Sequence, residues 1–243
     1  FVRYTDKGRL YKGYRLLAAD GSDIQIPTDS KHTDSYFPGT NGQAPYSLLH
    51  LNAVYDLLLH TYIDVDLCGR RDWNEQRALV NMVDRSFVEK ALIIADRGYE
   101  SYNLMAHIQE KGWKFLIRVK DIYSSGIASG LELPDSDEFD LHCPIQLTRR
   151  KKAETIPLFA DRNHYKWIGT STPFDYLPTG SHKHDPIAFY DLPFRIVRFK
   201  LSDSTYETVI TNLDEESFPP EELKHLYGMR WGIETSFREL KYT

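Results

Sequence analysis

The order of apolar and polar residues divides the first half of the chain into alternating strands and helices. Alternating or continuous apolar runs predict strands, and apolar residues at steps of three and four predict helices. The expected strands cover 14–20, a short extended piece ending at Pro27, 47–59, 60–67, 90–96 and 113–120. The expected helices cover 71–87 and 101–112, the second with Ser101 as N-cap and Gly112 as its stop.

The segment 90–120 has the pattern of a strand–helix–strand unit. Its apolar run ALIIA suits a strand that is buried on both faces. A helix of this length allows a right-handed crossover to a parallel strand. A turn at Gly21–Ser22 is expected to break the first strand, and the polar, turn-forming residues of 28–46 predict a loop. The first half therefore predicts an α/β fold.

From about 121 to 210 the texture of the sequence changes. Prolines and glycines separate short aromatic and β-branched pieces: HCPIQLT, YKWIGTS, FRIVRFKL and YETVITNL. Such pieces favour a mostly antiparallel β insertion. We therefore expect a core that begins in 1–120, an insertion over 121–210, and a return to the core in 211–243.

The last segment predicts an amphipathic helix with a mixed polar stripe. Pro219 and Pro220, followed by two acids, are typical of a helix start. At about 100° per residue, the stripe is roughly 60° wide and lies beside an apolar face. Its members are Tyr227, Arg230, Glu234 and Lys241, and the apolar face holds Leu226, Met229, Ile233, Phe237 and Leu240. A surface ion pair between Arg230 and Glu234 is one explanation. A site that holds phosphate beside a metal-binding acid is the other.

Composition excludes several classes of protein. The chain has 243 residues, of which 41% are hydrophobic and 27% charged, so it can form a sizeable core. No apolar run approaches the length of a membrane span, and no signal peptide is expected. The net charge of −5 does not attract DNA, so any nucleic-acid binding must use local basic patches. The segment TRRKK at 148–152 fits either a basic patch that contacts DNA or a solvated basic loop. The abrupt ends of the sequence lead us to expect a fragment.

Three acids stand out by their positions. Asp20 is expected at the end of the first strand, Asp96 at the end of the strand before the crossover helix, and Glu234 on the last helix. Functional groups gather at strand ends in open α/β sheets. Carboxylates without His or Cys partners suit Mg²⁺, and a pair of such ions can promote phosphodiester chemistry. Asp20 and Asp96 also fit turn formers, and Asp23 and Asp56 are rivals to Asp20.

Three motifs resemble the DDE transposases of bacterial insertion sequences, specifically the insertion-sequence-four type. LAADGSDIQIP is similar to the strand of that family's first aspartate, and LIIADRGYES to its second. YGMRWGIETSFRELK matches the family's Tyr-x2-Arg-x3-Glu-x6-Lys signature at all four positions. The resemblance spans nearly the whole chain, including the long gap before the glutamate.

The resemblance implies an RNase H-like core, a mixed five-stranded sheet flanked by helices, with a mostly antiparallel β insertion before the last catalytic helix. It implies that Asp20, Asp96 and Glu234 are catalytic and bind Mg²⁺ or Mn²⁺, with two ions expected. It also implies DNA contacts by Tyr227, Arg230 and Lys241, chiefly at the terminal phosphate. Trp231 is expected to pack the helix, and Trp167 is a candidate for stacking on a base.

The implied activity is metal-dependent cleavage at transposon ends and transfer of the 3′-hydroxyl into target DNA. The expected partners are transposon-end and target DNA, and the full-length protein is expected to form a homo-oligomer when DNA is bound. We expect a cytoplasmic, nucleoid-associated bacterial protein. The alternatives are an RNase H-like nuclease or resolvase that only cleaves, and an inactive domesticated DNA-binding protein. A generic α/β domain, in which the three acids lie far apart, also stays open.

Overall fold

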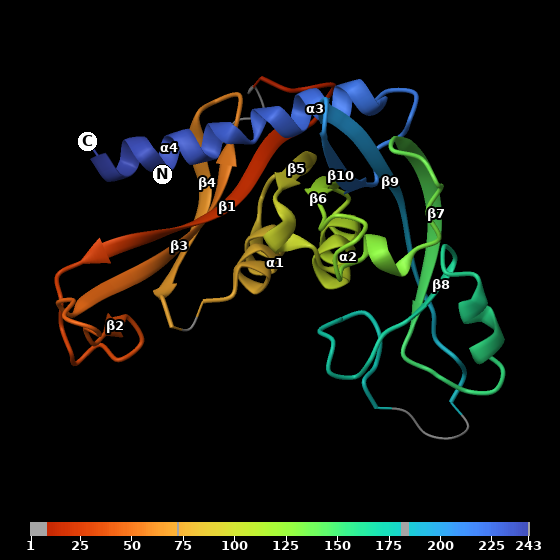
Figure 1. The fold of residues 1–243 in the computed structure, drawn as a ribbon, viewed down its shortest axis with the longest axis horizontal. Helices are drawn as coiled ribbons and strands as arrows, with labels where there is room; N and C mark the ends of the chain where they lie inside the picture. Colours follow the sequence, from red (N-terminus) through yellow and green to blue (C-terminus); the bar gives the residue numbers. More distant parts are fainter. Residues whose placement is uncertain (1–8, 72, 181–184, 243) are drawn as a thin grey trace.

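One ten-stranded mixed sheet runs through the computed structural model, which describes residues 9–71, 73–180 and 185–242. Its order is β2-β3-β1-β5-β6-β10-β9-β7-β8, with β4 paired to β3 (Figure 1). The strands are β1 Arg15–Ile26, β2 Tyr36–Phe37, β3 Tyr46–Asp56, β4 Thr61–Gly69, β5 Ala91–Ala95, β6 Lys114–Arg118, β7 Phe139–Thr148, β8 Tyr165–Trp167, β9 Tyr190–Ser202 and β10 Thr205–Thr211. The helices are α1 Glu75–Arg85, α2 Tyr102–Glu110, α3 Pro220–Met229 and α4 Trp231–Tyr242, with 3₁₀ turns η1 Arg97–Tyr99, η2 Ala128–Gly130 and η3 Ile156–Ala160.

The first strand differs from its prediction because it is continuous. β3 pairs antiparallel along β1 from Leu17 opposite Asp56 to Ile26 opposite Ser47, so the expected turn at Gly21–Ser22 is wrong. This long-range ladder outweighs the local turn preference of Asp-Gly. Asp20 therefore lies inside β1 and does not end it. The parallel pairing of β1 with β5 does stop next to it, at Ala19 opposite Ala95.

The strand–helix–strand prediction for 90–120 is confirmed. β5 and β6 are parallel neighbours joined through α2. Ser101 caps α2 by accepting the Leu104 N–H, and Gly112 follows the helix with a φ of +74°. α1 begins at Glu75, later than expected, because the Asn74 side chain accepts the Arg77 N–H and fixes the start there.

Helices cover both faces of the sheet. Odd-numbered core positions of β1 and β5, such as Leu17 and Ile93, pack against α1 and α2. Their neighbours on the other face, such as Leu16 and Leu92, pack against α3 and α4. Alternation of side chains along a strand explains why both faces of these central strands are apolar. α3 and α4 lie almost in line along one side of the molecule (Figure 1).

The last helix is interrupted, which the sequence did not predict. α3 ends at Met229 and α4 begins at Trp231, with Arg230 between them. The amide of Ile233 bonds to the carbonyl of Arg230 three residues earlier, which tightens the chain at this point. The start at Pro220 with Glu221 and Glu222 in the first turn is as predicted. Leu240, expected on the apolar face, is 54% exposed.

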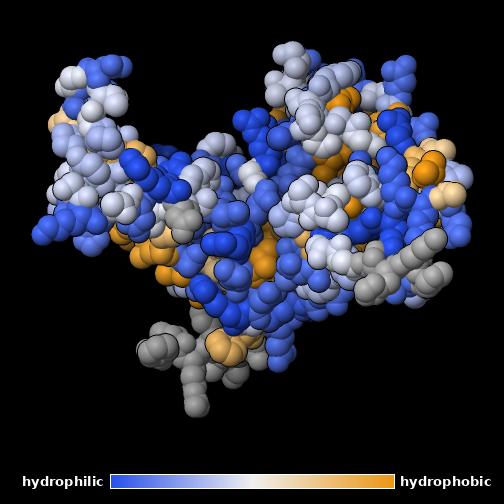
Figure 2. Space-filling model, turned by 90° about the horizontal axis from the view of Figure 1, so that it is seen from below, coloured by the Kyte–Doolittle hydropathy of each residue, from blue (hydrophilic) through white to orange (hydrophobic). Residues whose placement is uncertain are grey.

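The second half extends the same sheet. β10 pairs antiparallel with β6, β9 with β10, and β7 with β9, in agreement with a mostly antiparallel segment. β7 and β8 are parallel. The expected loop 28–46 contains the short strand β2, which pairs with the start of β3. The face turned away from α3 and α4 is largely hydrophilic, with apolar side chains in small separate areas (Figure 2). None of the helices described here has the length and apolar character needed to cross a membrane.

Candidate active site

Asp20 and Asp96 become neighbours through the register of β1 and β5. Ala19 lies opposite Ala95, and each aspartate follows directly. Asp96 leaves the strand and caps η1, its Oδ1 accepting the Gly98 N–H at 2.8 Å. The Asp20 side chain accepts the N–H of Gly21 at 2.8 Å. Both carboxylates thus face the same place, where the parallel part of the sheet ends.

Arg230 joins Asp20 to Glu234. Its Nη1 lies 3.3 Å from Asp20 Oδ2, and its Nη2 lies 2.5 Å from Glu234 Oε1. The arginine is 6% exposed, so this contact is largely shielded from water. Further along α4, Lys241 Nζ donates to Ser22 Oγ at 2.6 Å. The helix is therefore held across β1 at two points, and its first turn brings Glu234 to the aspartates.

The pKa of Asp20 is raised chiefly by its burial. Burial raises it from 3.8 to about 6, against the lowering effects of the Gly21 N–H and of Arg230. The charges of Asp96 and Glu234 raise it further. The register of β1 and β5 and the contacts of Arg230 with Asp20 and Glu234 place these acids in one region of the structure.

The raised pKa predicts the stability of an Asp20→Asn variant in the absence of divalent metal. The folded protein binds the Asp20 proton more tightly than the unfolded chain, so ionisation costs stability above pH 6 and costs nothing below about pH 4. Asp20→Asn should therefore raise the free energy of unfolding at pH 8 by up to about 3 kcal/mol. The gain should disappear as the pH falls to 4. Urea unfolding at both pH values measures this, and a variant less stable than the parent at pH 8 would contradict it.

The two rival acids of Asp20 have structural partners of their own. Asp23 pairs with His50 at 2.6 Å and with Arg70 at 2.8 Å. Asp56 is fully buried beside Arg15 and accepts the N–H groups of two residues in the β3–β4 turn. These partners explain Asp23 and Asp56 as structural acids, which leaves Asp20 as the acid of β1 and β3 that faces Asp96.

A fourth carboxylate, which the sequence did not reveal, lies against this group. Glu75 begins α1, and its Oε1 is 3.2 Å from Nε2 of the buried His50. A Cβ built on Gly21 would lie 2.6 Å from Glu75 Oε1, and one on Gly98 would lie 3.2 Å from Glu75 Oε2. The glycines beside Asp20 and Asp96 thus leave room for Glu75. Only the observed start of α1 could have revealed this, because the predicted start at 71 hides Glu75 inside the helix.

A comparison with family models decides the relationship. Residues 11–243 match the model described as "Transposase DDE domain". The chain belongs to the DDE transposase family. No curated protein sequence is significantly similar to it. One matching solved structure is the piggyBac transposase synaptic complex with hairpin DNA, at 11% identity and a TM-score of 0.47. That match covers 93% of this chain and 40% of the piggyBac chain, so this transposase domain spans less than half the length of that protein.

The DDE transposase family generally depends on divalent metal. Among the residues described, no three His, Cys, Asp or Glu side chains form a ready-made metal cluster. The side chains of Asp20, Asp96 and Glu234 nevertheless fit Mg²⁺, because they offer carboxylate oxygens. The charges of Asp96 and Glu234 raise the pKa of Asp20, and a cation would offset their repulsion. Arg230 supplies that charge in this structure through its contacts to Asp20 and Glu234.

The other signature residues of this transposase domain differ in exposure. Tyr227 and Arg230 are each 6% exposed, and the Tyr227 ring lies 5.8 Å from the Arg230 guanidinium carbon. The Tyr227 hydroxyl is buried, and burial raises its pKa against the lowering effects of Arg230 and Arg118. Lys241 is exposed. Trp231, expected to pack the helix, is 60% exposed, with its ring 5.5 Å from the Arg230 guanidinium carbon.

The basic patch 148–152 is partly structural. Arg149 donates to the backbone carbonyls of Gly169, Thr172, Phe174 and Leu177 and so ties down that loop. Lys151 lies over the ring of Trp167, which is 42% exposed. Arg149 is therefore committed to the fold, while Trp167 keeps the exposure that base stacking would need.

Proposed function

We propose that this protein is the catalytic part of a DNA transposase of the insertion-sequence-four type, which cleaves at transposon ends and joins the 3′-hydroxyl to target DNA. The observation that supports the proposal is the register that puts Asp96 beside Asp20, together with the Arg230 contacts that join Asp20 to Glu234. A complete Tyr-Arg-Glu-Lys signature on α3 and α4 supports the same type.

In this proposal the three carboxylates are the catalytic residues and hold Mg²⁺ or Mn²⁺, with two ions expected. The bound metal would activate water or a DNA hydroxyl and stabilise the leaving oxygen. The chain itself orients the acids: Gly21 and Gly98 N–H groups fix Asp20 and Asp96, and Arg230 fixes Glu234. No protein nucleophile is required.

The signature residues would then grip the DNA end at different depths. Lys241 is exposed and suited to direct phosphate contact. Arg230 is buried and contacts Asp20 and Glu234. We propose that it binds the terminal phosphate of the DNA beside these acids. Tyr227 packs behind Arg230 and would support it in that contact.

We also propose that β4-β3-β1-β5-β6, with helices on both faces, is the RNase H-like core. Its mixed order, with β1, β5 and β6 parallel and β3 and β4 antiparallel to their neighbours, supports this. We retain 1–120 and 211–243 as this core and 121–210 as the insertion. Homo-oligomerisation of the full-length protein on DNA, and action at the bacterial nucleoid, belong to the same proposal.

Cleavage of the protein's own flanking DNA tests the function. The substrate is a supercoiled plasmid that carries the coding region with its genomic flanks, incubated with the full-length protein. We expect nicks or breaks at the flanks with Mg²⁺ and none with EDTA. Joined products in a second plasmid support transposition, and free ends alone support the nuclease alternative. No cleavage under any metal condition would support the inactive DNA-binding alternative and overturn the proposal.

A further inference from the structure

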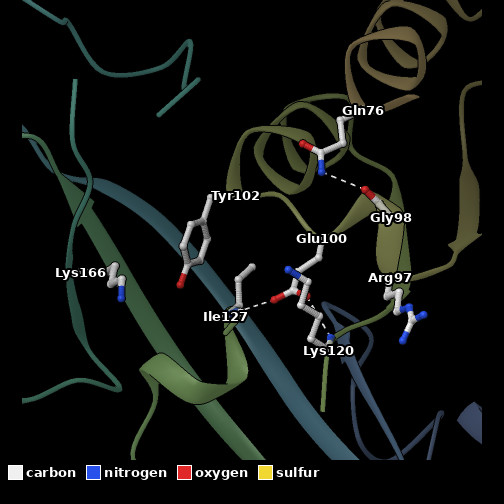
Figure 3. A pocket seen from close by; sticks show the side chains of 9 residues that line it. Gln76, Arg97, Gly98, Glu100, Tyr102, Lys120, Ile127 and Lys166 are labelled. Carbon is white, nitrogen blue, oxygen red and sulfur yellow. Dashed lines mark hydrogen bonds between the residues drawn. The ribbon is translucent and has the colours of Figure 1, made fainter. Parts of the chain in front are cut away.

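A cavity of about 460 Å³ opens beside Asp96. Asp20, Asp96 and Glu234 are not among the residues that line it. Arg97 and Gly98, from the 3₁₀ turn that Asp96 caps, form part of its wall. Lys120, from the segment after β6, and Lys166, from β8, also line it. Figure 3 shows Lys166 on one side and Arg97 on the other, with Lys120 and Glu100 between them. The cavity thus joins the proposed catalytic end of the sheet to the β-rich second half.

The cavity is positively charged on balance. Within the described part of the chain, no carboxylate forms an ion pair with Arg97, Lys120 or Lys166. The acid of the cavity, Glu100, accepts hydrogen bonds from the backbone N–H groups of Lys120 and Ile127 instead. Three cations around one concave space repel each other, and a bound anion would relieve that repulsion.

The wall of the cavity is held in place by that same glutamate. A Cβ on Gly126 would lie 2.6 Å from Glu100 Oε1, so the 121–130 loop approaches the carboxylate closely where a glycine permits it. The Gln76 side chain bonds to the carbonyl of Gly98 at 2.8 Å on the opposite wall (Figure 3). Walls fixed in this way position charges in advance, which lowers the cost of binding.

We propose that this cavity binds the backbone phosphates of a single DNA strand as it passes the catalytic carboxylates. The volume is that of a site for a small ligand or a short strand segment. Lys and Arg are the residues that neutralise DNA phosphates. The proposal rests on the transposase function, because it places the strand next to Asp96.

The test measures how tightly the protein binds a fluorescent oligothymidylate of about 20 nucleotides and a duplex of about 20 base pairs. Binding is followed by fluorescence anisotropy from about 50 to about 200 mM salt without divalent metal. The variant is Lys120→Gln/Lys166→Gln, and the matched control is Lys31→Gln/Lys111→Gln, at positions outside the cavity. For the single strand we expect a loss of affinity on the order of tenfold and a salt slope lower by about 1.4, since each phosphate contact contributes about 0.7. The control should bind as the parent does.

Thermal unfolding of both variants checks that they fold, and Lys166→Glu provides a second variant with a larger expected loss. Unchanged single-strand affinity and slope in folded Lys120→Gln/Lys166→Gln would overturn the proposal, as would an equal loss in the control. A loss confined to the duplex would also overturn it. Plasmid cleavage by the parent protein is scored separately, so a failure of this site is distinguishable from a failure of the transposase function.

Discussion

Asp96→Asn should abolish DNA cleavage while DNA binding persists. Asp96 is partly buried at the end of β5, and its side chain accepts the N–H of Gly98, as the amide oxygen of asparagine can also do. The fold should therefore survive, but the neutral amide is a much weaker ligand for Mg²⁺. Loss of metal stabilisation worth several kcal/mol predicts a rate lower by on the order of a thousandfold or more.

The measurement is the rate of plasmid cleavage in Mg²⁺, with DNA affinity and thermal stability determined on the same preparations. Asp203→Asn is the matched control, because Asp203 lies fully exposed in the turn between β9 and β10. The control should cleave at the parent rate. Cleavage by Asp96→Asn within tenfold of the parent would remove Asp96 from the catalytic group.

Arg230→Met should destabilise the metal-free protein and make Mg²⁺ a stronger stabiliser. Methionine keeps much of the apolar volume but leaves Asp20 and Glu234 without their shared counter-charge. Removing one partner from a buried ion pair costs about 3–5 kcal/mol. We expect about 2–4 kcal/mol here, because the Glu234 side chain is 31% exposed and partly screened by water.

Urea unfolding in EDTA and in Mg²⁺ measures both effects. Arg238→Met, at an exposed position of the same helix, is the control and should change stability little. The gain on adding Mg²⁺ should be larger in Arg230→Met than in the parent or the control, since a cation binds more readily where no guanidinium competes. Equal Mg²⁺ gains in all three proteins would show that Arg230 does not neutralise the acids proposed to bind metal.

Local sequence signals predicted those parts of the fold that local interactions determine. The helix cap at Ser101, the stop at Gly112 and the apolar run of β5 each depend on residues within a few positions, and each is found in the structure. The continuity of β1 through Gly21 could not be read in this way, because it depends on pairing with β3, a strand that begins twenty residues later.

The sequence predicted which residues form the candidate site better than it predicted their arrangement. The helical spacing of Arg230 and Glu234 indicated their contact, and motif resemblance selected Asp20 and Asp96. Position alone did not separate Asp20 from Asp23 or Asp56. That distinction needed the partners of each acid in three dimensions. The interruption of the last helix at Arg230 and the approach of Glu75 to Gly21 and Gly98 also arise from packing between distant elements.

Diffraction from crystals soaked in Mn²⁺ tests the metal site most directly, because the anomalous signal of manganese locates the ion without assumptions about ligands. We predict a peak at about 2.0–2.3 Å from carboxylate oxygens of Asp20, Asp96 and Glu234, a distance typical of small divalent cations. We also predict that the Arg230 guanidinium no longer bridges Asp20 and Glu234. A manganese ion bound elsewhere, with Arg230 still joining those two acids, would contradict the proposed metal site.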